Sequence, residues 1–320
     1  MNRALSNTAL AIAVSVSTSA FAQNSQVTQM EPVIVVGGIS PVAADEFGRS
    51  STIITRQDIE DRGYATVQQA LQAQPGISMN GDGPSNRQIR IRGGEGNHTL
   101  ILIDGVRAAA ADSEYVLRGL DASYIERIEV LRGPQSVPFG TDAASGAVNI
   151  VTREAGAGWN YGGSIEFGEG DRESAYLSHE SDRARFSINV SNANDRGIDY
   201  SGSGGERDGT TWESASTKAE LDVTNRTTAG FTIRLADAFY HRDDNDSDAV
   251  DADGYVVDAS STTGRSERAG SIYVDHSAAS GTLNHRLRLD QTVQKESTED
   301  DQFGPSRSNL RTQVANYRFQ

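Results

Sequence analysis

Alternation of apolar and polar residues is the clearest pattern in the second half of the chain. In residues 183–191 the positions Ala184, Phe186, Ile188 and Val190 are apolar, whereas arginine, serine and asparagine stand between them. Because successive side chains of a β-strand point to opposite faces, this period of two predicts a strand with one apolar and one polar face.

Further segments after residue 153 repeat the alternation. Residues 283–290 carry leucine at three alternate positions with asparagine and arginine between them, and residues 231–235 alternate in the same way. We count about eight such strand candidates, at a spacing near that of membrane-spanning strands.

The joints between these candidates differ in length. Residues 225–226 and 278–281 predict short turns, whereas residues 194–211 and 242–264 predict long loops. Short turns at one end and long loops at the other are typical of an outer-membrane β-barrel, whose strands turn their apolar face outward. A soluble β-sandwich, which would hide the same face in a core, is the alternative.

Residues 51–153 have a different pattern, typical of a compact α+β unit. Residues 51–55 predict a strand, and Thr55 and Thr66 are expected to cap two short helices. Residues 88–92 alternate strictly, and residues 99–103 form a continuous apolar run that predicts a buried strand. An Asp-Gly pair then predicts a tight turn.

The first 30 residues predict export. Arg3 precedes the apolar run of residues 9–16, and Ala20-Phe21-Ala22 has the form of a cleavage site, so residues 1–22 are interpreted as a signal peptide. Beyond them no apolar stretch approaches the roughly 20 residues of a spanning helix. The chain contains no cysteine, which excludes disulfides and thiolate metal sites.

The chain is acidic. A formal net charge of -15 argues against nucleic acid as a partner. No arrangement of a nucleophile with its base, no phosphate loop and no metal-ligand spacing is found, so an enzyme is the weakest hypothesis. Arginines and glutamates at positions 90, 92, 126, 127, 129 and 132 are interpreted as structural charges.

Residues 125–153, IERIEVLRGPQSVPFGTDAASGAVNIVTR, combine a charged alternating strand, a Gly-Pro turn, a run of small residues and a second strand. This stretch closely resembles the end of the plug domain of TonB-dependent outer-membrane receptors. The resemblance implies an α+β plug domain followed by antiparallel transmembrane β-barrel strands. The structural charges would then pair with the wall of the barrel lumen. A plugged barrel needs about 22 strands, so we expect the chain to be the N-terminal portion of a longer receptor.

The resemblance also implies a domain order. We expect a signal peptide at 1–22, a periplasmic tail at 23–49, a plug at 50–153 and an incomplete barrel at 154–320. Within the tail, residues 31–36 look like a TonB box, a strand-forming segment that a partner could pair with. The predicted TonB-binding residues are Glu31, Pro32, Val33, Ile34, Val35 and Val36. Only residues 23–30 precede the box, so no signalling module is expected.

The implied function is active import of a scarce ligand too large for porins. The partners would be TonB with the inner-membrane ExbB–ExbD complex, outer-membrane lipid, and a metal chelate as ligand. The phrase NHTLILIDGVR and the early acidic loops look most like the cobalamin receptors. A ferric-siderophore receptor is the runner-up, and an outer-membrane adhesin or structural β-protein is the alternative from another class.

The acidic loops raise the possibility of calcium. Ca²⁺ takes 6–8 oxygen ligands, but the spacing here is not that of an EF-hand. On composition alone, a solvated acidic loop is favoured over a calcium site. The cobalamin receptors order their first outer loops with Ca²⁺, and the resemblance implies that role for an approximate set of ligands. These are Asp199, Glu206, Asp208, Asp248 and Asp258.

Overall fold

The computed structural model describes residues 33–34, 42–43, 50–80, 88–108, 120–134, 141–199, 207–245, 256–278, 283–300 and 304–319. Within these ranges no helix is both long enough and apolar enough to cross a membrane. Two sheets organise the fold, and we call them the small sheet and the long sheet.

The small sheet has five strands in the order β3-β8-β9-β6-β7. All neighbours are antiparallel except β6 and β9, which are parallel. A separate hairpin pairs β4 with β5. The strands are β3 (Ser51–Thr55), β4 (Ile77–Asn80), β5 (Gln88–Ile91), β6 (Thr99–Ile103), β7 (Val106–Arg107), β8 (Ile125–Arg132) and β9 (Gly146–Thr152).

Two short helices, α1 (Arg56–Arg62) and α2 (Val67–Gln72), begin at the predicted threonines. The Thr55 hydroxyl accepts the N–H of Asp58, and the Asp58 carboxylate accepts the N–H of Thr55 at 2.9 Å. This reciprocal capping box satisfies donors that a helix start leaves open. Gly63 ends α1 with a φ of 63°, a conformation that costs glycine little.

Branched apolar side chains fill the core of the small sheet. The continuous apolar run of β6 is buried along its whole length, as predicted. Residues of both helices pack against the sheet in the same cluster. The largest members that are fully buried include Leu71, Ile89, Ile91, Ile125, Ile128 and Ile150.

The run of small residues before β9 allows close packing, as expected. A Cβ atom added to Gly146 would lie 2.3 Å from the carbonyl oxygen of Leu131 and 2.8 Å from the Ile91 side chain. Such distances are far below van der Waals contact. Glycine at this position therefore lets β9 lie directly against β8.

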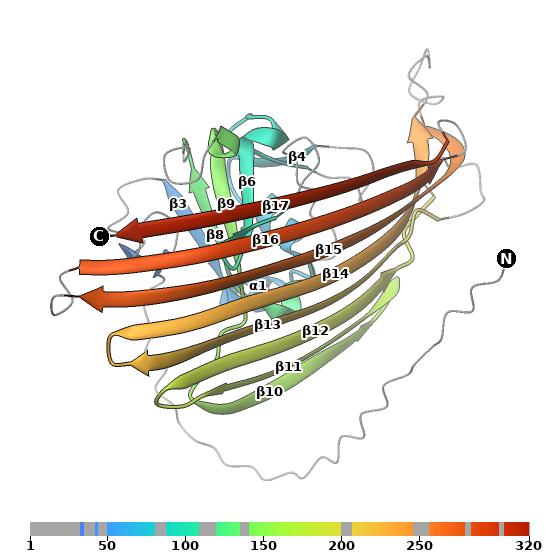
Figure 1. The fold of residues 1–320 in the computed structure, drawn as a ribbon. Coiled ribbons are helices and arrows are strands. Elements are labelled where there is room, and N and C mark those ends of the chain that lie inside the picture. The colour runs from blue at the N-terminus through green and yellow to red at the C-terminus, as the bar shows by residue number, and fades with distance from the viewer. Residues whose placement is uncertain are drawn as a thin grey trace, which may run out of the picture. The chain divides into compact units, whose positions relative to one another are not determined.

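The long sheet contains eight antiparallel strands that follow one another in chain order, β10 to β17, as Figure 1 shows from green to red. The expected number of strands is therefore confirmed. The strands are β10 (Gly158–Phe167), β11 (Gly170–Glu180), β12 (Ala184–Asp195), β13 (Thr210–Thr224), β14 (Thr227–Asn245), β15 (Val256–Ala278), β16 (Leu283–Asp300) and β17 (Ser306–Phe319). Most exceed the 9–11 residues that a tilted strand needs to span a bilayer.

One predicted loop is wrong at both ends. Residues 242–264 were expected to be a long loop, but β14 continues to Asn245 and β15 already begins at Val256. The serines, threonines and glycine before residue 265 are residue types that favour turns, and they therefore predict a loop from the sequence. In the sheet they pair by their backbones with both neighbours, and Ser261 and Thr263 are buried.

Near the N-terminus, β1 (Val33–Ile34) pairs with β2 (Val42–Ala43) in a two-stranded antiparallel sheet. Two residues of the predicted TonB box are therefore paired within the chain. The pairing engages one edge of each strand. The other four residues of the predicted box lie outside the described ranges.

Candidate functional site

The outward face of the long sheet is apolar and exposed, whereas its inward polar face is buried. On β12, Ile188 and Val190 are 44% and 45% exposed, but Ser187 and Asn189 are each only 2% exposed. A soluble β-sandwich would show the reverse, so that alternative does not fit. An exposed apolar face of this extent is stable only against lipid.

Other strands of the long sheet show the same arrangement, with apolar side chains exposed and polar side chains buried. On β14, Phe231, Ile233 and Leu235 are exposed while Thr232 and Arg234 are buried. On β16 the predicted outward leucines at positions 283, 287 and 289 are all exposed. The alternation predicted from the sequence is therefore confirmed, with its apolar side outward.

The apolar band slopes across the sheet. Its upper end on β10 is Phe167, which lies in the register row of Phe239 of β14. On β15 its upper end is Ile272, which lies in the register row of Phe231 of β14. Because Phe231 is eight residues below Phe239, the upper end of the band drops by eight residues over the five strand steps from β10 to β15. With about 3.3 Å per residue and about 4.8 Å between strands, this corresponds to strands tilted by roughly 45°. Tilted barrel strands require such a slope if the band is to stay level in a bilayer.

The buried polar face is held by charge pairs. Arg234 pairs with Glu267, and Arg265 lies 3.3 Å from the same carboxylate and donates to the Gln294 side chain at 2.8 Å. Buried charges of this kind persist only when paired and hydrogen-bonded. The inward face is thus a polar lining.

The small sheet meets this lining at the turn between β6 and β7. Asp104 and Gly105 both have positive φ, 50° and 73°, which makes the tight turn predicted for this pair. The Asp104 carboxylate lies 3.0 Å from Nζ of Lys218 on β13, and its carbonyl oxygen accepts from Arg288 of β16 at 2.8 Å. A Cβ on Gly105 would stand 2.7 Å from the Arg288 guanidinium, so glycine allows this approach without a shift of the arginine.

This contact continues into the small sheet through buried polar side chains. The Asp104 carboxylate also accepts from the hydroxyl of Thr152 at 2.8 Å. The Gly105 N–H donates to Asn149, whose amide donates to the fully buried Glu129 at 2.9 Å. A connected network with its partners in place is stable at low dielectric, whereas losing one member leaves a buried charge unpaired.

The arginines and glutamates of β8 have partners within the small-sheet region, which corrects an expectation. They were expected to pair with the lumen wall. Glu126 pairs with Arg56 at 3.2 Å, and Arg132 donates to the Thr52 hydroxyl at 2.6 Å. Burial, together with the nearby Arg92, lowers the pKa of Arg132.

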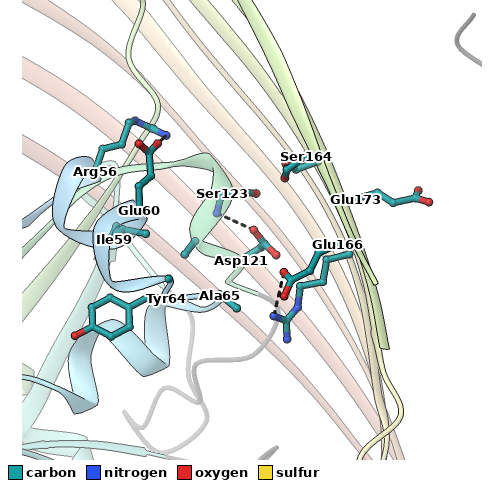
Figure 2. A pocket seen from close by; sticks show the side chains of 14 residues that line it. Arg56, Ile59, Glu60, Tyr64, Ala65, Asp121, Ser123, Ser164, Glu166 and Glu173 are labelled. Atoms are coloured by element: carbon teal, nitrogen blue, oxygen red, sulfur yellow. Dashed lines mark hydrogen bonds and ion pairs between the residues drawn. The ribbon is translucent and has the colours of Figure 1, made fainter. Parts of the chain in front are cut away.

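A cavity of about 330 Å³ lies between α1 and strands β10 and β11. Figure 2 shows Arg56 and Glu60 on the helix side and Glu166 on the strand side, all directed toward it. Arg56 lies 3.7 Å from Glu60, and Arg172 lies 3.8 Å from Glu166. The cavity is lined largely by charged and hydroxyl groups.

The described residues leave the calcium prediction untested. Glu206 and Asp248 lie outside them, and only the backbone of Asp258 is described, within β15. Asp208 is 3% exposed and its N–H donates to the Ile198 carbonyl. Within the described ranges, no group of three or more His, Cys, Asp or Glu side chains could hold a metal ion.

Sequence reasoning missed the residues that join the two sheets, namely Asp104, Lys218, Arg288 and Thr292. Thr292 donates its hydroxyl to the carbonyl of Arg107 at 2.8 Å. Each residue carries a local signal, because Asp104 is in a predicted turn and the other three occupy inward strand positions. Nothing local indicates which of them meet.

Known proteins share both parts of this arrangement. Residues 43–147 match the family described as TonB-dependent receptor plug domain. An iron-regulated outer membrane virulence protein of Vibrio cholerae is 38% identical over 152 residues, which is 45% of this chain and 23% of that protein. The chain thus matches under a quarter of the length of this curated relative.

Solved structures share the fold at low identity. A ferric enterobactin receptor of Pseudomonas aeruginosa, solved with enterobactin, is 22% identical with a TM-score of 0.61, covering 83% of this chain and 46% of that one. The alcaligin outer membrane receptor of Bordetella pertussis is 18% identical with a TM-score of 0.65, covering 89% and 46%. The predicted fold class, a mixed sheet followed by antiparallel strands of a plugged barrel, is confirmed.

Proposed function

Because this chain carries the plug domain and barrel strands of a TonB-dependent receptor of the Gram-negative outer membrane, a family of transporters rather than enzymes, we propose that it imports a ferric siderophore. The bound chelate would pass into the periplasm past the small sheet. TonB, energised by ExbB–ExbD, would supply the work.

The polar seating of the small sheet is the observation that carries this proposal. The turn at Asp104 is held by Lys218 and Arg288, and a charged cavity separates α1 from β10 and β11. Polar contacts of this kind can be exchanged for hydrogen bonds to water when the plug moves, whereas opening an apolar seal would expose apolar surface to water. A plug seated in this way can move or rearrange while the lipid-facing wall stays intact.

The choice of ligand rests on the relatives. The Vibrio cholerae protein is named as iron-regulated, and the structural neighbours are named as receptors for enterobactin and alcaligin. These names support the ferric siderophore, the runner-up of the sequence reading, over cobalamin. Cobalamin stays a second candidate through the plug phrase at residues 97–107.

Growth of a deletion strain separates the two ligands. We expect the strain to lose growth on a ferric siderophore as sole iron source and to keep cobalamin-dependent growth. Complementation with the gene is the control. Loss of cobalamin-dependent growth alone would reverse the assignment, and unchanged growth on every siderophore and on cobalamin would contradict both.

The role of residues 31–36 as a TonB box is tested by deletion. We expect the variant to bind its ligand with unchanged affinity but to import none, because only energy transfer is lost. A deletion of equal length within residues 23–30 is the matched control. A TonB pull-down with the same variants separates a transporter from an adhesin or structural β-protein, which would have no need of TonB.

A further inference from the structure

The outward face of the long sheet changes charge above the apolar band. On β11, β13 and β14 the first charged row contains Glu173, Glu213 and Asp237, with Asn192 of β12 between them. On β15 to β17 the rows above the band contain cations and amides instead. Counted upward from the band, the first row contains Gln291 and Gln313, the second Arg268 and Arg311, the third Lys295 and Asn309, and the fourth Arg307.

The cations are close neighbours. Arg268 and Arg311 flank Val293 in one register row, and Lys295 stands in the next row between them. Diagonal neighbours on adjacent strands lie about 7–8 Å apart, within reach of long side chains. One group a few ångströms wide could therefore contact at least two of these three charges.

Two of the side chains are held in place. The Arg311 guanidinium donates to the Gln291 side-chain oxygen at 2.7 Å, and the Gln313 amide donates to the same oxygen at 3.0 Å. Arg268 lies 2.7 Å from Asp237. Near the cations, the described part of this face carries two carboxylates, Asp237 and Glu299, and Glu299 lies two rows above Lys295. The cations are four in number, Arg268, Lys295, Arg307 and Arg311. They therefore outnumber the carboxylates here, in a protein whose net charge is -15.

The position of these residues identifies the kind of partner. Below the cations, past the row of Gln291 and Gln313, lies the exposed apolar rung of Ile272, Leu289 and Ala315. They lie toward the strand ends that carry the long connections, which face outward in such barrels, whereas the short turn at 225–226 is at the opposite end. They therefore stand at the headgroup level of the outer leaflet.

We propose that Arg268, Lys295 and Arg311 form a binding site for the phosphate groups of a lipid in the outer leaflet of the outer membrane. The acyl chains would lie along the apolar rung below, and the phosphates would contact the cations. A ligand from the aqueous phase would not use the apolar rung, and continuity between the two surfaces therefore favours the lipid. The row of Glu173, Glu213 and Asp237 would not attract the same headgroup.

Native mass spectrometry of the full-length receptor in detergent tests the site, with bisphosphorylated lipid A as the probe. Basic residues near an anionic surface contribute about 1 kcal/mol each, or about fivefold in affinity. The double variant Lys295→Gln, Arg311→Gln should therefore bind the lipid about thirtyfold more weakly. The control Glu213→Gln, on the acidic part of the same face, should bind as wild type does.

Two further arms separate the sources of phosphate. Dephosphorylated lipid A should bind wild type and double variant equally, and inorganic phosphate at millimolar concentration should not displace the phosphorylated lipid. A heat-modifiability gel shift establishes that each variant is folded. Equal retention of phosphorylated lipid A by the wild type and the folded double variant would overturn the proposal. Full displacement by inorganic phosphate would also overturn it.

Discussion

The small sheet and the long sheet bury opposite kinds of side chain. In the core of the small sheet, apolar residues such as Leu71 of α2 and Ile150 of β9 are buried, and the fully buried carboxylate of Glu129 is hydrogen-bonded. In the long sheet, residues such as Thr292 are buried and Leu235 is exposed. Apolar β-strand residues are therefore buried in the small sheet but exposed on the long sheet, because the first is surrounded by water and polar groups and the second by lipid.

Truncating one leucine in the core of the small sheet and one on the outward face of the long sheet should show this difference most strongly. Leu71→Ala should destabilise the small sheet by about 2–5 kcal/mol, because it leaves a cavity in a packed core. Leu235→Ala should have a much smaller effect, since lipid chains fill the space. Hydrogen exchange of small-sheet amides and the heat-modifiability of the barrel measure the two effects. Equal effects would contradict the inversion.

A charged side chain on the lipid-facing side of the long sheet should reduce stability almost as much as Leu71→Ala. Ile233→Arg should destabilise the barrel by about 2–4 kcal/mol if the residue lies near the bilayer midplane. The matched control Thr227→Arg, on the same face at the short-turn end of β14, should cost about 0–1 kcal/mol. Chemical unfolding of the receptor in lipid vesicles gives both values. If the two variants are equally stable, the band is not in the membrane.

The contact between the sheets should respond to the loss of one charge. Asp104→Asn removes the ion pair with Lys218, whose side chain is 18% exposed, and should weaken the seating by about 1.5–3 kcal/mol. Amides of β6, β7 and β9 should exchange faster, while those of β14 stay unchanged. Asp237→Asn, whose side chain is 52% exposed, is the control and should leave exchange in the small sheet unaltered.

The smallest expected effect is at the start of α1. The hydrogen bonds from the side chain and backbone of Thr55 lower the pKa of Asp58 below its ordinary value of 3.8. The folded state therefore gains stability from the carboxylate above pH 3.8 and loses it as the pH falls through the lowered pKa. Asp58→Asn should flatten this acid dependence of exchange in α1, whereas Asp61→Asn should retain it. Thr55→Ala should cost about 1 kcal/mol at neutral pH.

Much of each sheet could be predicted from the sequence because its signals are local. Thr55 and Thr66 begin the two helices, β6 is a buried apolar run, and the Asp104–Gly105 pair makes its turn. The error at residues 242–264 has the same origin. Serine, threonine and glycine favour turns locally, but pairing with two neighbouring strands outweighs that preference.

The sequence by itself determined the two kinds of element, the period of two in the long sheet and the resemblance of residues 125–153 to a plug. Only the tertiary structure decided which partners Asp104, Glu129 and Arg132 have, since Asp104 and Lys218 are more than a hundred residues apart. It also decided which residues of neighbouring long-sheet strands lie at the same depth in the membrane, because the slope of the apolar band depends on the register between strands. Register and long-range charge pairing are properties of the assembled sheet, and no single segment encodes them.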